Sequence, residues 1–493
     1  MKPRGNVTFY LNGKRLEVSP EHSRMMLSDY LRYEKSLVGT KVVCAEGDCG
    51  ACSVLRFFPH KAPQGSKNGF IAFNSCITTV AQMDGASLVT VDALAKEKEE
   101  SIELSPVQSA MVACHGSQCG FCTPGFVVAL TGAIEEKIDS KKSTGPCCLT
   151  SQEAKNALTG NLCRCTGYQP IIEAATSIDF SKVESVSERF YSNAQDKDLK
   201  KIQSTPLFVS DGHFSLYAPK NTRDAVKYLS KNKTARLIAA STDLGVVVNK
   251  GKVKFEKLLS LHLITELYDL KKVGAGRVSV GARVTLSELR SFLKKIVPEF
   301  STFLDLFASP QIKNVATLIG NVGNASPIAD TPPFLLVCDA VVHIAGPKGK
   351  RKVRLDQFYL AYRKTALKAG EMITSIDFAI PKKGESLALY KTSQRKDLDI
   401  SIVNTAIRVN WKTAEKSSIK DIQIAMGGIA ATPFRFKKTE AYLKTVSCTD
   451  ANLKKALVIL HSEINPLSDL RGSTAYRRVL VENLFLKFFR DHA

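Results

Sequence analysis

The stretch Cys44-Ala45-Glu46-Gly47-Asp48-Cys49-Gly50-Ala51-Cys52 holds three cysteines within one short segment, and a fourth follows at Cys76. The spacing Cys-x4-Cys-x2-Cys with a distant fourth cysteine is typical of a [2Fe–2S] cluster, because a tight loop brings three thiolates together. Gly47 and Gly50 permit backbone angles that let amide N–H groups approach the sulfur atoms. Structural zinc and buried free thiols are the alternatives, although zinc sites favour paired Cys-x2-Cys knuckles.

A second set of four cysteines follows, as Cys119-x2-Cys122 and Cys163-x-Cys165. By spacing alone, a second [2Fe–2S] cluster and a four-cysteine zinc site both remain open. Eleven of the thirteen cysteines lie between Cys44 and Cys165, which indicates a separate cysteine-rich module. In a long chain without an apolar signal core at its N-terminus, thiolate–metal chemistry is favoured over a disulfide scaffold.

The composition is that of a soluble globular protein, with 44% hydrophobic and 24% charged residues among 493. This length predicts several domains, and no apolar run approaches the roughly 20 residues that cross a bilayer. We therefore expect a cytoplasmic protein without a membrane association. The net charge of +22 lies in residues 181–493, since residues 1–180 hold 18 basic and 18 acidic residues. Without a nucleic-acid-binding motif, a solvated basic face is expected rather than a nucleic-acid site.

Hydrophobic periodicity predicts a multidomain α+β chain. Residues 6–18 form a hairpin around Asn12-Gly13 and, with later strands, favour a β-grasp ferredoxin-like domain. Capping boxes and N-terminal prolines begin short helices near residues 105, 123, 150 and 170, which favours a four-helix iron–sulfur bundle. The predicted boundaries are 1–95 for the ferredoxin-like domain, 96–180 for the helical domain, 181–206 for a polar linker, 207–383 for an α+β domain and 384–493 for a C-terminal α+β subdomain.

Two segments of the C-terminal half are rich in small and polar residues. Leu237-Ile238-Ala239-Ala240-Ser241-Thr242-Asp243-Leu244-Gly245 reads as a strand, a turn and the start of a helix, which can present N–H groups to a pyrophosphate. The segment 307–330 is rich in Gly, Ser, Thr and Asn, so the chain can lie close to an extended dinucleotide. No GxGxxG fingerprint is present, so a Rossmann dinucleotide unit is not expected.

The residues around these motifs resemble the xanthine oxidase family of molybdenum hydroxylases. The iron–sulfur resemblance rests on Gln118-Cys119-Gly120-Phe121-Cys122-Thr123-Pro124-Gly125 and on Gly160-Asn161-Leu162-Cys163-Arg164-Cys165-Thr166-Gly167-Tyr168. The two small-residue segments resemble the family's FAD-binding domain, which is of the vanillyl-alcohol oxidase type. Ala240 departs from the pattern, because the family usually has glycine at that position.

The resemblance implies a set of cofactor residues. It implies that both cysteine sets bind [2Fe–2S] clusters and that the segment from Leu237 to Leu244 cradles the FAD pyrophosphate. Further flavin or adenosine contacts are implied at Phe307, Thr317, Asp330, Ile373 and Lys391. Cys114, Cys147, Cys148, Cys338 and Cys448 match no ligand position of the family. We interpret the adjacent pair Cys147-Cys148 as incidental thiols in a loop, and a redox-active pair is the alternative.

The resemblance ends before the molybdopterin-binding portion, so it implies an electron-transfer subunit whose partner chain carries the molybdenum cofactor. Electrons would pass through both clusters to FAD and then NAD, within a heterotetramer that oxidises a purine. A relay subunit serving an aldehyde or N-heterocycle is the nearer alternative, because the substrate site lies on the partner. A zinc-bearing basic interaction protein is the remote alternative.

Overall fold

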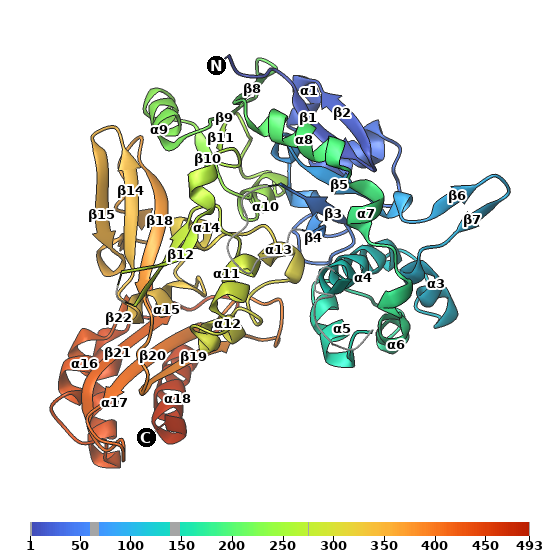
Figure 1. The fold of residues 1–493 in the computed structure, drawn as a ribbon. Helices are drawn as coiled ribbons and strands as arrows, with labels where there is room; N and C mark the ends of the chain where they lie inside the picture. The colour runs from blue at the N-terminus through green and yellow to red at the C-terminus, as the bar shows by residue number, and fades with distance from the viewer. Residues whose placement is uncertain (1, 60–68, 139–147, 275, 493) are drawn as a thin grey trace. The chain divides into compact units, whose positions relative to one another are not determined.

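The computed structural model describes residues 2–59, 69–138, 148–274 and 276–492 (Figure 1). These residues form two compact units, which are Met1–Glu266 with Ser309–Ala316 and Leu267–Ala308 with Thr317–Ala493. The division crosses the predicted α+β domain 207–383, because its first sheet shares a hydrophobic core with the N-terminal domain in unit 1. In unit 1, the segment Ser309–Ala316 includes the short helix α13 (Pro310–Lys313), which packs on strand β4.

The N-terminal domain is built on a five-stranded sheet in the order β2-β1-β5-β3-β4. The strands are β1 (Val7–Leu11), β2 (Lys14–Val18), β3 (Ser53–Phe57), β4 (Ile71–Asn74) and β5 (Ser87–Val89), and the short helices are α1 (Pro20–Ser23) and α2 (Leu27–Asp29). The predicted hairpin is confirmed, since Asn12 and Gly13 have φ angles of 52° and 81°, as a tight two-residue turn requires. Pairing of β1 with β5 is parallel and gives the mixed sheet expected of a β-grasp domain.

The helical domain contains the four predicted helices. They are α3 (Pro106–Ala113), α4 (Thr123–Ile138), α5 (Ser151–Leu158) and α6 (Gln169–Ser177). Ser105 and Thr150 form the expected capping boxes, in which each hydroxyl accepts from the amide three residues later. A hairpin that the sequence pattern did not predict, β6 (Lys96–Lys98) with β7 (Ser101–Glu103), precedes these helices. All six of its strand residues are exposed, so its pattern lacks the alternation of buried and exposed residues used to detect strands.

The predicted linker 181–206 contains two capped helices, α7 (Val186–Phe190) and α8 (Asn193–Gln203). Its polar composition concealed a narrow apolar face, on which Leu199 and Ile202 are buried. Gln195 donates to the Gly13 carbonyl at 2.9 Å. This segment is therefore packed structure rather than a loose connection.

The rest of unit 1 is a four-stranded sheet in the order β10-β11-β9-β8. Its elements are β8 (Leu207–Ser210), β9 (Ser215–Ala218), α9 (Thr222–Lys231), β10 (Arg236–Ile238), α10 (Leu244–Asn249) and β11 (Lys257–Ser260). A largely buried ion pair of the β-grasp domain meets this sheet at His262. Arg4 donates to both oxygens of Asp84 at 2.8 and 2.6 Å, and His262, just after β11, lies 3.5 Å from the same carboxylate.

Unit 2 contains two larger sheets, in the orders β12-β13-β18-β14-β15 and β19-β20-β21-β22. The strands of the first sheet are β12 (Leu270–Val273), β13 (Arg277–Gly281), β14 (Val341–Gly346), β15 (Gly349–Arg354) and β18 (Met372–Ala379). Between β15 and β18 in the chain, β16 (Tyr359–Ala361) and β17 (Lys364–Thr365) form a separate pair. The strands of the second sheet are β19 (Glu385–Thr392), β20 (Val403–Trp411), β21 (Ile419–Gly427) and β22 (Phe434–Arg435). The helices are α11 (Leu286–Leu293), α12 (Pro298–Phe303), α14 (Leu318–Gly323), α15 (Pro332–Val337), α16 (Lys437–Leu443), α17 (Asp450–Glu463) and α18 (Thr474–His492).

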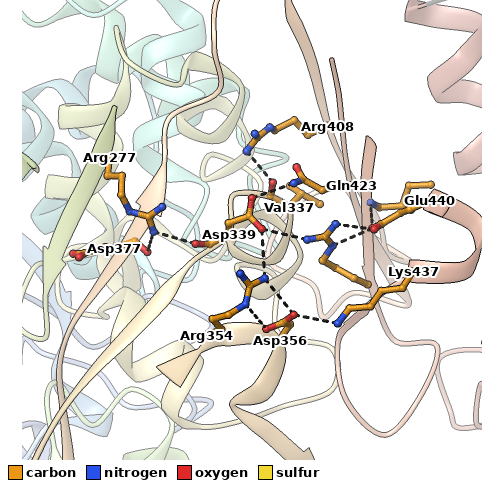
Figure 2. A network of polar contacts seen from close by, with 12 residues as sticks. Arg277, Val337, Asp339, Arg354, Asp356, Asp377, Arg408, Gln423, Lys437 and Glu440 are labelled. Atoms are coloured by element: carbon orange, nitrogen blue, oxygen red, sulfur yellow. Dashed lines mark hydrogen bonds and ion pairs between the residues drawn. The ribbon is translucent and has the colours of Figure 1, made fainter. Parts of the chain in front are cut away.

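A polar network centred on Asp339 connects the two sheets of unit 2 (Figure 2). Its carboxylate accepts from Gln423 of β21 at 3.0 Å and from Arg435 of β22 at 3.2 Å. Its backbone carbonyl accepts from Arg277 of β13 at 3.0 Å. Arg435 also pairs with the buried Glu440 at 2.7 Å. Shared donors and acceptors of this kind hold the two sheets in one orientation.

Within the described parts of the chain, no helix combines the length and the apolar character that crossing a membrane would need.

The Arg4–Asp84 pair predicts a large effect of Asp84→Asn on unit 1. Burial alone raises the pKa of Asp84, but hydrogen bonds from Arg4 and His262 outweigh it and leave the pKa below its ordinary value. Breaking a buried pair costs about 3–5 kcal/mol of unfolding free energy, which urea denaturation at pH 7 would measure. Because the folded pKa is lowered, the carboxylate's contribution is present above the ordinary value of about 3.9 and is lost as the pH falls. The difference in unfolding free energy between the wild type and Asp84→Asn therefore becomes smaller in acid.

Asp198→Asn is the matched control, because Asp198 pairs with Arg15 at 2.9 Å where both side chains are partly exposed. Exposed pairs contribute about 0–1 kcal/mol. Equal losses of unfolding free energy in Asp84→Asn and Asp198→Asn would contradict a structural role for the buried pair.

Candidate metal centres and flavin site

The first cysteine set converges at the end of the β-grasp sheet. Cys44, Cys49 and Cys52 lie in the loop before β3, and Cys76 lies in a 3-10 helix, Ser75–Ile77, just after β4. The thiols of Cys49 and Cys76 hydrogen-bond to Cys44 and hold its pKa far below the ordinary range. A hydrogen bond from Cys76 likewise lowers the pKa of Cys52. The four sulfur atoms are therefore mutual neighbours, as a common cluster requires.

The backbone of this loop suits a sulfur-ligated cluster. Gly47 and Gly50 have φ angles of 74° and 70°, which side chains rarely tolerate. The amides of Glu46 and Cys49 both donate to the Cys44 sulfur at 3.4 Å. A Cβ at Gly50 would stand 2.2 Å from the Gly160 carbonyl oxygen, so glycine also permits the close packing of this loop. Four thiolates with N–H donors on sulfur are the donor set that a [2Fe–2S] cluster takes.

The second set lies in the helical domain. Cys119 and Cys122 precede α4, whereas Cys163 and Cys165 lie between α5 and α6. The sulfur atoms of Cys119 and Cys165 are 3.5 Å apart. Burial, followed by a hydrogen bond with Cys163, raises the pKa of Cys122 to about 12. The predicted ligands are thus brought together in pairs from distant parts of the sequence.

Among the residues that the structure describes, no three or more His, Cys, Asp or Glu side chains are arranged to hold a single metal ion. A [2Fe–2S] cluster has a different requirement, because each of its irons takes two protein thiolates. The geometry of both sets fits this pairing of ligands.

Hydrogen bonds connect the two cysteine loops directly. The amide of Leu162, beside Cys163, donates to the carbonyl of Cys49 at 3.1 Å. Asn161 donates its side-chain amide to the carbonyl of Gly50 at 3.3 Å, and its own oxygen accepts from Gln311 at 2.7 Å. In the sequence, Asn161 stands out only as part of a motif, and no local pattern points to Gln311. These contacts depend on segments far apart in the chain.

The predicted pyrophosphate segment, from Leu237 to Leu244, begins in β10 and ends at the first residue of α10. Ser241 is the member with a left-handed backbone, at φ 65°, and its buried hydroxyl has no hydrogen-bond partner in the structure. A hydroxyl held at a tight turn is a suitable donor for a phosphate oxygen. Ala240 does not have a positive φ, so the missing glycine at that position causes no backbone strain.

The other predicted flavin residues belong to unit 2. Lys391 of β19 and Asp330 form a buried ion pair at 2.9 Å. Ser401 donates to the same carboxylate, as does Asn404 at 3.1 Å. The Lys391 ammonium also lies 6.0 Å from the centre of the Phe307 ring. The network thus holds Lys391 and Asp330 rigidly, and sequence reasoning missed Asn404 because it lies within an apolar strand.

The two remaining residues of the predicted flavin set have structural neighbours in unit 2. Thr317 is the N-cap of α14, where its hydroxyl accepts from the Gly320 amide at 3.0 Å. Ile373 is buried on β18 and pairs with Ile344 of β14. The candidate FAD residues consequently form two sets, with Ser241 in unit 1 and Asp330, Lys391, Thr317 and Ile373 in unit 2.

The remaining cysteines are separate from these sets in chemistry. Cys338 is fully buried, and burial raises its pKa to about 12, so it is a packed neutral thiol. Burial also raises the pKa of Cys448. Cys148 is only partly buried, whereas Cys147 lies outside the described residues, so the redox role of this pair stays untested.

Comparison with known proteins identifies three domains in the chain. Residues 90–176 match a [2Fe-2S] binding domain, residues 212–383 match the FAD binding domain in molybdopterin dehydrogenase, and residues 388–492 match the CO dehydrogenase flavoprotein C-terminal domain. These domains and their order fit the iron–sulfur and FAD subunit of the xanthine oxidase family of molybdenum hydroxylases. The chain corresponds to the iron–sulfur and flavin part of that family's proteins, and the predicted fold class is confirmed.

The similarity to curated relatives extends over nearly the whole chain. It is 28% identical to xanthine dehydrogenase 1 of Arabidopsis thaliana over 97% of its length and 28% identical to xanthine dehydrogenase/oxidase of Gallus gallus over 98%. The chain spans only 39% and 40% of those two relatives. A solved chain of carbon monoxide dehydrogenase from Hydrogenophaga pseudoflava is 25% identical, with a TM-score of 0.53, and the match covers 56% of this chain and 95% of that one.

A [2Fe–2S] cluster on each cysteine set would give two separable spectroscopic signals. Cys76→Ser should remove one [2Fe–2S] electron paramagnetic resonance (EPR) signal from the reduced protein, and Cys165→Ser should remove the other. Each change should also lower the iron content by about half, since each cluster depends on four thiolates. Cys448→Ser is the control and should keep both signals. A colourless protein that binds zinc in place of iron would contradict this assignment.

The unpartnered hydroxyl of Ser241 predicts a contribution to FAD binding. A hydrogen bond to a charged group contributes about 1.5–3 kcal/mol, so Ser241→Ala should weaken FAD binding about tenfold or more. Titration of the flavin-free protein with FAD, followed by flavin fluorescence, measures the change. Ser230→Ala is the control, because the Ser230 hydroxyl already donates to the Val226 carbonyl at 2.7 Å. Equal affinities in the wild type and Ser241→Ala would exclude this hydroxyl from the site.

Proposed function

We propose that this chain is the iron–sulfur and FAD subunit of a xanthine dehydrogenase, and that it carries electrons from a molybdenum cofactor on a partner chain to FAD and then NAD. The observation that carries the proposal is the direct hydrogen bond from the Leu162 amide to the Cys49 carbonyl, at 3.1 Å. It joins the two cysteine sets within one compact unit, so both clusters would lie on one short route.

The exposure of the two sets supports a direction for that route. Cys119 and Cys165 are exposed, whereas Cys52 and Cys76 are buried. A cluster at the surface can receive electrons from a partner, and a buried cluster is protected from solvent and adventitious acceptors. We therefore place the helical-domain cluster next to the molybdenum cofactor and the β-grasp cluster next to the flavin.

Apolar side chains around the exposed set support a docked partner. The Phe121, Leu162 and Tyr168 side chains are 49%, 42% and 37% exposed, and they flank the Cys119 set in sequence. Exposed apolar residues beside a redox centre are typical of a contact surface. The curated relatives extend well beyond the matched region, and a separate solved chain of a carbon monoxide dehydrogenase is matched over 95% of its length. We therefore place the molybdenum-binding part on a separate large subunit within a heterotetramer.

In unit 1 the Ser241 hydroxyl suits a flavin phosphate, and in unit 2 the Lys391–Asp330 pair is a fixed polar group of the predicted flavin set. When bound, FAD would supply the chemistry that converts single-electron transfer into transfer of an electron pair as a hydride to NAD⁺. Each cluster holds one electron at a time, so the clusters alone could not perform hydride transfer.

The relatives favour xanthine as the substrate of the assembled enzyme, and oxidation of xanthine with water to urate releases two electrons and two protons. A second function has support of its own, because the similar solved chain belongs to a carbon monoxide dehydrogenase. The same relay could serve that substrate, an aldehyde or an N-heterocycle, since the oxidised molecule binds outside this chain.

Co-purification is the decisive test of this proposal. Isolation of the native complex through this chain should yield iron, FAD and a larger chain containing molybdenum. Xanthine should then reduce NAD⁺, whereas carbon monoxide, benzaldehyde and quinoline should not. Reduction of an artificial dye by NADH with this chain alone would test the NAD acceptor. Turnover of another substrate in place of xanthine would favour the alternative, and an iron-free, flavin-free chain would refute the relay altogether.

A further inference from the structure

Helix α10 carries a set of contacts that the predicted cofactor motifs do not account for. It begins at Leu244, where the candidate pyrophosphate segment ends, and it finishes at Asn249 beside the first cysteine set. Both the helix and this cysteine set belong to unit 1. The inference below rests on the proposed function and concerns how the chain places these two sites.

Asn249 attaches the C-terminal end of α10 to the loop that carries Cys44, Cys49 and Cys52, which we call the cluster loop. Its side-chain amide donates to the carbonyls of Ala45 and Cys76, both at 2.8 Å. Ala45 follows the ligand Cys44, and Cys76 is itself a ligand, so one side chain spans both parts of the cysteine set. Lys250 adds an exposed ion pair to Glu46 at 3.0 Å, which contributes little by itself.

Gly245 allows the N-terminal end of α10 to lie against the backbone at Ile77. A Cβ on Gly245 would stand only 2.2 Å from the carbonyl oxygen of Ile77, so the helix backbone lies directly against the backbone that follows Cys76. Val246 packs on the small buried cluster of Cys52, Cys76 and Ile77. Any larger residue at position 245 would have to push the helix away from the cysteine set.

The start of the helix is also part of the candidate flavin loop. The Gly245 amide donates to the Ser241 carbonyl at 2.7 Å, and the Val247 amide donates to the Asp243 carbonyl at 3.1 Å. A displacement of α10 would therefore move Ser241, whose free hydroxyl is the candidate phosphate donor. The cluster loop and the flavin loop are connected through one short rigid element.

We propose that Gly245 and Asn249 are positioning residues, which hold α10 against the Cys44 cluster and thereby set the distance between that cluster and FAD. The two residues would thereby influence the rate of electron transfer between the cluster and FAD, because that rate falls steeply as the distance between two redox centres grows.

The test uses the full chain loaded with iron and FAD, and the variants Asn249→Ala and Gly245→Ala. A photochemical one-electron donor reduces the flavin, and loss of that electron to the cluster is followed at the visible bands. Both variants should slow this exchange several-fold, and Gly245→Ala should weaken FAD binding as well. The EPR g-values of the Cys44 cluster should shift in Asn249→Ala, because the Cys76 carbonyl loses its donor.

Matched controls separate positioning from general destabilisation. Asn232→Ala removes a similar side-chain bond to the Tyr228 carbonyl, at 3.0 Å, and Gly5→Ala adds a Cβ that meets no atom within 4 Å. Both controls should match the wild type in exchange rate and EPR spectrum. If the two α10 variants also match the wild type, the inference is overturned while the relay stands. A wild-type chain that holds no flavin or iron would overturn the proposed function instead.

Discussion

The convergence of four thiols at the end of the β-grasp sheet is the constraint on which the rest of unit 1 depends. A loop that carries Cys44, Cys49 and Cys52 must turn tightly, and it does so through the left-handed backbone of Gly47 and Gly50. Once turned, the loop exposes its carbonyl groups to its neighbours. Those carbonyls, rather than the thiols, are where the surrounding segments attach.

Three residues from two segments donate hydrogen bonds to these carbonyls. Leu162 of the helical domain binds the Cys49 carbonyl, Asn161 binds the Gly50 carbonyl, and Asn249 of α10 binds the Ala45 carbonyl. Backbone acceptors need a partner when they are withdrawn from water, so satisfying them also sets the position of each neighbour. The loop would therefore combine two tasks, which are ligation of the predicted cluster and alignment of the elements on either side.

In unit 2, networks of side chains hold the neighbouring elements in place. The Asp339 network connects its two sheets, and the Lys391–Asp330 pair is held by Ser401 and Asn404. A buried ammonium without a partner would be costly, so each charge is paired and further hydrogen-bonded. This arrangement keeps a charged group in a fixed place without adapting the backbone, whereas unit 1 relies on glycine and backbone contacts.

The amino-acid sequence predicted the candidate ligands and the local elements around them, because cysteine spacing and helix and turn signals act over a few residues. It predicted the hairpin at Asn12-Gly13, the four bundle helices and both cysteine sets. Tertiary structure alone decided that the segment 181–206 is packed, that the sheet β8–β11 shares a core with the N-terminal domain, and that Asn249 reaches the Cys76 carbonyl. These features join residues far apart in the chain, such as Asn249 and Cys76, which are 173 positions apart. No local pattern specifies which distant carbonyl a given amide will meet.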